Sequence, residues 1–247
     1  MADYDAFSYC YDRFTDDVDY PSRTRRLLEL FERYDRKPTL LLDLACGTGN
    51  FSFPLANSGI DVIGVDCSEG MLAAAMAKLP EGCTNPLFLN QYAEELELYG
   101  TVDGAISMLD SLNHITEYEN FCKAIQRVSL FLEKDRLFIF DLNTPYKHSA
   151  VLGDNIFVRE DETAFCIWQN EYAGNNTVDI YLDFFVENKN GSYERFSESF
   201  SEVAYTIKEV QSALDAAGLE LVAILDDMTD NPPTEETERI TYIVRKK

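Results

Sequence analysis

The chain has 247 residues, 46% of them hydrophobic and 13% aromatic, which suits one globular domain with an inserted element better than two independent domains. The 21 basic and 44 acidic residues give a formal net charge of −23, and such a field disfavours binding to a phosphate backbone. No apolar run approaches the roughly 18 residues that a membrane span needs. We therefore expect neither nucleic acid nor a membrane as a partner.

The six cysteines are scattered, with no C-x-x-C pair and no nearby histidine, which indicates reduced thiols and no metal site. Residues 1–14 are acidic and aromatic, and they lack the basic start and apolar stretch of a secretory signal peptide. We therefore expect a cytoplasmic protein without a bound metal.

Helical and strand patterns alternate through the first part of the chain. Helices are predicted over residues 21–36, 50–57, 69–78 and 118–132. Buried strands are predicted over residues 39–45, 61–66, 86–90, 102–108 and 136–142. This alternation is typical of βαβ units and predicts an α/β fold with a doubly wound, mostly parallel sheet.

The pattern changes after residue 155. Three β-rich runs, at residues 163–172, 177–187 and 193–204, are joined by hairpin signals and predict an antiparallel meander. A helix then begins at the capping box of Thr206 and Glu209 and ends at Gly218, and strands over 219–225 and 240–244 complete a seven-stranded sheet. We therefore expect one domain formed by residues 1–155 and 204–247, with residues 156–203 as an inserted antiparallel β subdomain over the active site.

The segment LLDLACGTGNFS at residues 41–52 runs from a strand through a glycine turn into a helix. Asp43 lies at the carboxyl end of that strand, where open α/β sheets bind ligands. Asp66 ends the next strand, where a carboxylate can accept hydrogen bonds from both ribose hydroxyls of a nucleoside. Ser52 stands where the dinucleotide fingerprint G-x-G-x-x-G has its third glycine, so an NAD-dependent oxidoreductase remains an alternative.

The motif D-L-A-C-G-T-G (43–49), followed by V-I-G-V-D-C-S-E-G-M-L (62–72), resembles the first two motifs of class I S-adenosylmethionine-dependent methyltransferases. Segments 4–20, 107–115 and 204–219 are similar to parts of a small-molecule subgroup of that family. The resemblance implies a Rossmann-like methyltransferase fold. It also implies methyl transfer from S-adenosyl-L-methionine to a small-molecule acceptor, with S-adenosyl-L-homocysteine as product. A cofactor-binding regulatory protein without catalysis is the alternative from another class.

The resemblance also implies roles for individual residues. Asp43 and the glycine turn would line the methionine part of the cofactor, Asp66 would hold the ribose, and Cys67 and Met71 would pack on the adenine. Tyr92 replaces the aspartate of the family's third motif, so Asn90 or Gln91 is an alternative acceptor at the adenine edge. The complete implied cofactor set is Tyr11, Tyr20, Asp43, Ala45, Cys46, Gly47, Gly49, Asp66, Cys67, Met71, Gln91, Tyr92, Ala93 and Leu109.

Methyl transfer from a sulfonium is an in-line displacement, so much of the catalysis can come from proximity, worth ~7–11 kcal/mol. A general base is needed only for a protonated nucleophile. The catalytic candidates are Asp110, Asn113 and His114. Asp110 is expected to orient the substrate, and His114 is either a base or a structural hydrogen-bonding residue.

Several expectations concern the acceptor side. Tyr11 and Tyr20 lie in the N-terminal leader, residues 4–20, and either close over the sulfonium donor or pack the leader against the sheet. Aromatic and polar residues of the insertion either line the acceptor pocket or form ordinary cross-strand pairs, namely Trp168, Tyr172, Tyr181, Phe185 and Arg195. The acceptor is expected to be a small metabolite such as an amine, O-methylation stays open, and a homodimer is one alternative for the oligomeric state.

Overall fold

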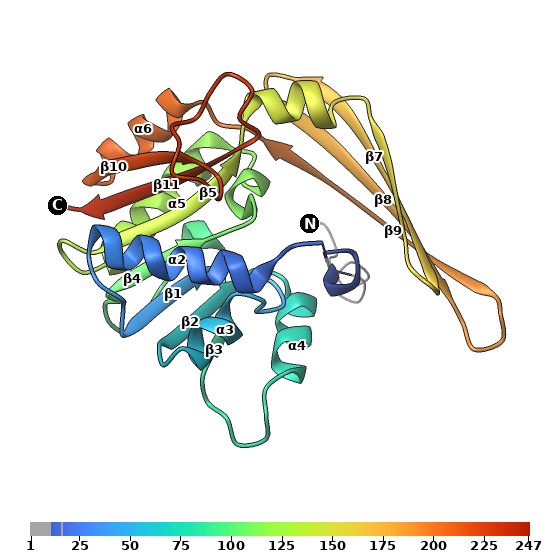
Figure 1. Cartoon of the computed structure of the whole chain (residues 1–247), viewed down its shortest axis with the longest axis horizontal. Helices are drawn as coiled ribbons and strands as arrows, with labels where there is room; N and C mark the ends of the chain where they lie inside the picture. Colours follow the sequence, from blue (N-terminus) through green and yellow to red (C-terminus); the bar gives the residue numbers. More distant parts are fainter. Residues whose placement is uncertain (1–10, 16) are drawn as a thin grey trace.

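The computed structural model describes residues 11–15 and 17–247 and has a seven-stranded sheet in the order β10-β11-β5-β4-β1-β2-β3 (Figure 1). Its strands are β1 (Leu40–Leu44), β2 (Asp61–Asp66), β3 (Leu87–Asn90), β4 (Gly104–Ser107), β5 (Leu137–Asn143), β10 (Leu219–Asp226) and β11 (Arg239–Lys246). The five neighbouring strands β3, β2, β1, β4 and β5 pair in parallel. Strand β11 runs antiparallel to both of its neighbours, β5 and β10. The doubly wound, mostly parallel sheet predicted from the sequence is confirmed.

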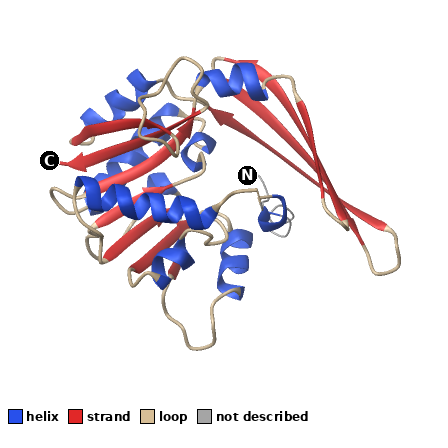
Figure 2. Ribbon diagram, in the orientation of Figure 1, coloured by secondary structure: helices blue, strands red, loops and turns tan. Residues whose placement is uncertain are grey.

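Helices cover both faces of this sheet (Figure 2). On one face, α2 (Tyr20–Tyr34) and α3 (Ser52–Asn57) contribute buried side chains to a core with β1, β2 and β5. On the other face, α5 (Tyr118–Phe131) and α6 (Ile207–Ala216) do the same with β1, β4, β5 and β11. The α4 helix (Glu69–Ala77) follows β2. Within the described part of the chain, every helix falls short of the length and hydrophobicity that a membrane crossing requires.

A second, antiparallel sheet has the order β6-β7-β8-β9 and extends away from the main sheet as a long arm (Figure 1). Its strands are β6 (Ile156–Glu160), β7 (Ala164–Gly174), β8 (Thr177–Glu187) and β9 (Tyr193–Val203). The sequence pattern predicts only the last three. Strand β6 is short and alternates exposed with half-buried side chains, so it carries no buried apolar run. The π-helical segment η3 (Lys147–Leu152) joins β5 to this sheet and is also absent from the prediction.

The ends of two predicted elements can be compared with the structure. The capping box is confirmed, because Thr206 Oγ1 accepts from Glu209 N and Glu209 Oε2 accepts from Thr206 N. The fourth strand is shorter than predicted. Val102 forms only an isolated bridge to Leu132, and the backbone turns left-handed soon after Ser107. The short helical turns η1 (Ala93–Glu95) and η2 (Ser111–His114) follow β3 and β4.

Candidate functional site

A cavity of about 810 Å³ opens at the carboxyl ends of β1, β2 and β4. This is the edge where open α/β sheets bind ligands. Three of the residues predicted for the site are not among its lining residues: Gly49, Asp110 and Asn113. The other predicted residues do line it, namely Tyr11, Tyr20, Asp43, Ala45, Cys46, Gly47, Asp66, Cys67, Met71, Gln91, Tyr92, Ala93, Leu109 and His114. The structure therefore brings most of the predicted set around one space.

The two glycines of the turn after β1 have different surroundings. Both have positive φ, +54° at Gly47 and +80° at Gly49, which favours glycine at each position. A Cβ on Gly47 would meet nothing within 4 Å, so its bare backbone borders open space at the cavity. A Cβ on Gly49 would lie 2.9 Å from the ring of Phe53. Gly47 thus leaves room for a ligand, whereas Gly49 lets the turn pack against α3.

Asp66 is held in one orientation by backbone donors. Its Oδ2 accepts from Gly47 N at 2.8 Å, and its Oδ1 accepts from Ser68 N at 2.8 Å. Burial raises the pKa of Asp66, while these backbone donors act in the opposite direction. Each oxygen keeps a further lone pair, so the carboxylate can accept from hydroxyl groups in the cavity.

Asp43 is almost fully buried at the end of β1. Ser52 Oγ donates to its Oδ2 at 2.5 Å. Burial raises the pKa of Asp43 to about 7, and the nearby Asp66 acts in the same direction. Ser52, which stands at the third glycine position of the dinucleotide fingerprint, therefore fixes the Asp43 carboxyl group by donating a hydrogen bond to it.

The edge beyond β3 departs from the simplest expectation for an adenine acceptor. Both ends of the Gln91 amide bind the backbone of Glu97, with Nε2 donating to O at 3.1 Å and Oε1 accepting from N at 2.8 Å. Asn90 Nδ2 donates to Asp66 O at 3.1 Å. The Gln91 side chain is thus already bonded to this loop, while Tyr92 is exposed at the cavity.

The turn after β4 places two residues that are not glycine in the left-handed region, with φ of +58° at Leu109 and +54° at Asp110. Such conformations cost free energy and persist where the surroundings fix them. Here the fully buried Asp141 carboxylate accepts from Leu109 N at 3.0 Å and from Asp110 N at 2.6 Å. Arg239 Nη1 donates to Asp141 Oδ1 at 2.8 Å. A side chain from β5 therefore shapes this wall of the cavity.

Asp110 and Asn113 are occupied by contacts within the protein. Asp110 lies 2.6 Å from Arg239 and accepts from Asn143 Nδ2 at 2.8 Å. Burial raises the pKa of Asp110, but the charges of Arg239, Lys147 and His114 outweigh it, so the net shift is downward. The fully buried Asn113 donates to Val203 O at 2.8 Å and accepts from Asn143 N at 3.0 Å. This geometry favours scaffold roles for both residues.

His114 is the catalytic candidate that borders the cavity. Its side chain is 31% exposed, and its Nε2 lies 3.6 Å from Oε1 of Glu202, a buried residue of β9. The imidazole ring also packs on Phe200, with 4.9 Å between ring centroids. His114 thus borders the cavity and also contacts Glu202 and Phe200 of β9.

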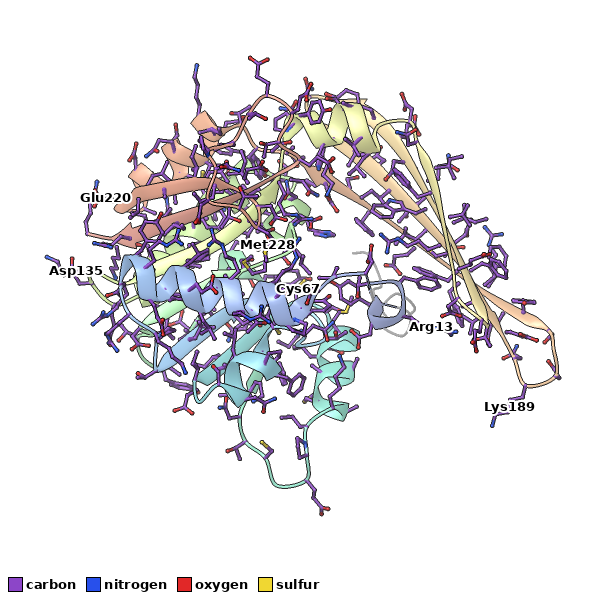
Figure 3. All side chains as sticks on the ribbon, in the orientation of Figure 1. Arg13, Cys67, Asp135, Lys189, Glu220 and Met228 are labelled. Atoms are coloured by element: carbon purple, nitrogen blue, oxygen red, sulfur yellow. The ribbon has the colours of Figure 1, made fainter. Side chains whose placement is uncertain are left out.

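Two described residues of the leader, Asp12 and Arg13, link the glycine turn to the inserted sheet. Asp12 accepts from Thr48 Oγ1 at 2.6 Å and lies 2.5 Å from Lys78 Nζ. Arg13, which Figure 3 shows between the main body and the arm, donates to Asp161 at 2.5 and 2.7 Å. Tyr20 packs edge-on against Phe51, and both Tyr11 and Tyr20 line the cavity. Burial raises the pKa of Tyr11 well above its usual value.

The inserted residues expected at the acceptor pocket are not among the residues that line the cavity. Trp168 Nε1 donates to Asn170 Oδ1 at 2.6 Å. Phe185 and Arg195 are direct cross-strand partners, and the guanidinium lies 5.9 Å from the ring centroid. The geometry favours the alternative in which these side chains are cross-strand pairs.

Sequence reasoning missed four residues that shape the site: Asp12, Asp141, Glu202 and Arg239. No spacing rule could find them, because each acts on a segment far away in the chain, such as Arg239 on Asp141 at a separation of 98 residues. The weak signal that did exist was a polar residue inside an apolar strand, Asp141 in LFIFDLN. The described residues contain no group of three or more His, Cys, Asp or Glu side chains placed to hold a metal ion.

Comparisons with known proteins agree with this geometry. The family described as "Methyltransferase domain" matches residues 41–131. A putative methyltransferase of Geobacillus sp. (strain WCH70) is 32% identical over 98% of this chain and 99% of its own length. The crystal structure of an S-adenosylmethionine-dependent methyltransferase from Clostridium acetobutylicum ATCC 824 superimposes with a TM-score of 0.89, at 32% identity and 98% coverage of both chains.

A more distant structure shows how widely this fold is used. An amino pentose methyltransferase from Micromonospora echinaspora, solved with S-adenosylmethionine bound, has a TM-score of 0.76 at 17% identity and covers 97% of this chain and 96% of its own. The full-length relatives and the shared fold make S-adenosylmethionine the cofactor of this chain and exclude the NAD-dependent oxidoreductase alternative. The chain belongs to the class I S-adenosylmethionine-dependent methyltransferases.

Proposed function

We propose that this enzyme methylates the nitrogen of a small amine and that His114 takes the proton of the incoming nucleophile. The observation that carries the proposal is that the partly exposed imidazole opens into the same cavity as Gly47, Asp43 and Asp66. The net charge of −23 favours a cationic acceptor and disfavours a nucleic acid. The amino pentose methyltransferase named above uses the same fold, which is consistent with a small amine.

The lining residues fit the cofactor. The open space beside Gly47 leaves room for close backbone approach, and the fixed Asp66 carboxylate suits a pair of ribose hydroxyls. The carboxyl group of Asp43 suits a cationic ammonium group, and Met71 and Cys67 offer a soft surface to a flat ring. When bound, S-adenosylmethionine supplies a methyl group on a positively charged sulfur.

An amine arrives at neutral pH mainly as an ammonium ion, which has no free lone pair. Neutral imidazole is a suitable base for such a group, because its unperturbed pKa is near 6.5. We assign the proton to His114 Nε2, the ring atom nearest Glu202. Leu109, in its left-handed conformation, contributes to the wall beside the nucleophile. Asp110 contributes indirectly, by fixing Arg239 and Asn143.

The inserted sheet takes part through its base rather than its tip. The last residues of β9 lie against η2, where Asn113 binds Val203 O and His114 approaches Glu202. We therefore propose that residues 156–203 form a separate structural unit that completes the acceptor side. The tip around Lys189 lies far from the main body in Figure 3.

A methyl-transfer screen tests the proposal. The full chain is incubated with methyl-labelled S-adenosylmethionine and separate pools of primary amines, phenols and RNA, and the labelled product is identified. We expect transfer to an amine and loss of at least 100-fold in kcat for His114→Ala, in keeping with the roughly 10²–10⁴-fold contribution of a general base. Transfer to phenols or RNA would replace the acceptor class. No transfer, combined with thermal stabilisation by S-adenosylhomocysteine, would favour a regulatory protein.

A further inference from the structure

Glu202 is a buried carboxylate that lies between both histidines of the chain. Its Oε1 lies 3.6 Å from His114 Nε2, and its Oε2 lies 3.5 Å from His148 Nε2. Asn143 Nδ2 also donates to Oε2, at 3.4 Å. The Glu202 side chain is only 5% exposed, so its charge is poorly solvated and needs these neighbours. The three partners come from η2, η3 and β5, and Glu202 itself comes from the inserted sheet.

Two neighbours fix the orientation of the His148 ring. The fully buried ring places Nδ1 2.8 Å from Asn176 O, and because a carbonyl oxygen only accepts, Nδ1 carries a hydrogen and donates. Its Nε2 lies 3.5 Å from Glu202 Oε2. Oε2 is thereby engaged, and Oε1 is left to face His114.

We propose that Glu202 is a positioning residue for His114: its carboxylate, 3.6 Å from Nε2, places a negative charge that stabilises the imidazolium formed when Nε2 takes a proton from the acceptor. The inference rests on the proposed function and deepens it, because it makes the base of the inserted sheet part of the proton-accepting unit. The proton leaves the acceptor nitrogen, whose freed electron pair forms the new bond to carbon. It then resides on His114 Nε2 beside Oε1.

Three other charged side chains interact with His114 or Glu202. Asp66 on β2 and Asp110 in the turn after β4 both interact electrostatically with His114, but each is bonded elsewhere, to backbone donors and to Arg239 respectively. Lys147 on η3 faces Glu202 and Asp110. Among these carboxylates, Glu202 is the one within 4.0 Å of the imidazole nitrogens.

A purely structural alternative exists, in which Glu202 only anchors β9 to η2 and η3. The two roles differ in what they do to protonation. A structural anchor changes stability and kcat but leaves the pH dependence of the reaction alone. A carboxylate that stabilises imidazolium also raises the pH at which His114 releases its proton.

The test uses Glu202→Gln in the full chain, with Glu202→Asp as a second variant and Glu198→Gln as the matched control. Glu198 is also a buried glutamate of β9. The chain has only two histidines, so their imidazole NMR signals can be followed against pH in the complex with S-adenosylhomocysteine and assigned with His148→Asn. For Glu202→Gln we expect the His114 midpoint to fall by roughly 0.5–1 pH unit. The acidic limb of kcat/KM should fall with it, and kcat should fall at least tenfold.

Glu202→Asp keeps the charge and should keep most of the wild-type midpoint while lowering kcat. Glu198→Gln should leave the midpoint and the profile unchanged. An unchanged His114 midpoint in Glu202→Gln would overturn the inference. Because the NMR titration needs no acceptor, it decides the role of Glu202 even if the amine proposal fails, and the failure of that proposal would appear separately as no methyl transfer by the wild-type chain.

Discussion

The cavity has two walls that are built from different parts of the chain. The cofactor wall is local: Gly47 binds Asp66 across 19 residues, and Ser52 binds Asp43 across 9. The acceptor wall is assembled from distant segments, with Arg239 bound to Asp141 across 98 residues and Asn113 to Val203 across 90. The cofactor wall relies on backbone donors and glycine, whereas the acceptor wall relies on buried charges held against one another. A shared cofactor can thus be served by a short motif, while the acceptor side depends on the whole tertiary structure.

The largest effect should come from breaking the buried charges of the acceptor wall. Arg239→Met leaves Asp110 and the fully buried Asp141 without their cation. We expect a loss of about 3–5 kcal/mol in the free energy of unfolding, measured by urea denaturation. The control Arg195→Met removes an ion pair with Asp183 in which the arginine side chain is 60% exposed. It should lower the free energy of unfolding by less than about 1 kcal/mol. Equal losses in the two variants would contradict the contrast.

The next effect probes the cofactor wall. Asp66→Ala removes a carboxylate that can accept from two hydroxyls, each charge-assisted bond being worth about 1.5–3 kcal/mol. We expect S-adenosylhomocysteine to bind about 100-fold more weakly, measured by isothermal titration calorimetry. Asp61→Ala changes the exposed first residue of the same strand and should leave the affinity unchanged. If Asp66→Ala bound the product normally, the ribose contact would have to lie elsewhere.

The pH dependence of cofactor affinity should be smaller. Burial raises the pKa of Asp43 to about 7, so the free protein holds this proton at pH 6 and releases it as pH rises. A cationic ligand favours the carboxylate, and affinity should therefore increase through pH 7, with about a tenfold loss at pH 6. Measurements between about pH 5.5 and 7.5 keep the ligand's α-amino group protonated. Asp43→Asn should abolish the dependence, and its persistence in that variant would assign it to another group.

The smallest effects concern the leader. Asp12→Ala removes contacts to Thr48 and Lys78 and should weaken S-adenosylhomocysteine binding by about threefold to tenfold. Arg13→Ala breaks a surface pair, with side chains 30% and 33% exposed, and should change the free energy of unfolding by less than about 1 kcal/mol. Calorimetry and urea denaturation measure the two effects. If Arg13→Ala weakened S-adenosylhomocysteine binding more than Asp12→Ala did, the contact of the leader with the inserted sheet would matter more for the cofactor than its contact with the glycine turn.

The same contrast explains what the sequence could predict. The alternating strands and helices, the glycine turn and the capping box at Thr206 all arise from residues near one another, so periodicity and short motifs identify them. Strand β6 and η3 have no such local signal. Asp110 was expected to orient substrate, but its neighbours Arg239 and Asn143 come from other segments and occupy its carboxylate. Which face of a polar residue is free depends on tertiary partners that spacing cannot reveal.

The leader has a thermodynamic consequence for the two substrates. Asp12 holds the turn at Thr48, and the next residue, Arg13, holds Asp161 of the inserted sheet, so a single peptide unit joins the two anchors. If binding of S-adenosylmethionine fixes Asp12 and Arg13 in these contacts, it also orders the inserted sheet before the acceptor binds. Such linkage is reciprocal, and the acceptor must then increase donor affinity by the same factor. We therefore expect S-adenosylmethionine and the acceptor to bind cooperatively, with S-adenosylmethionine binding first.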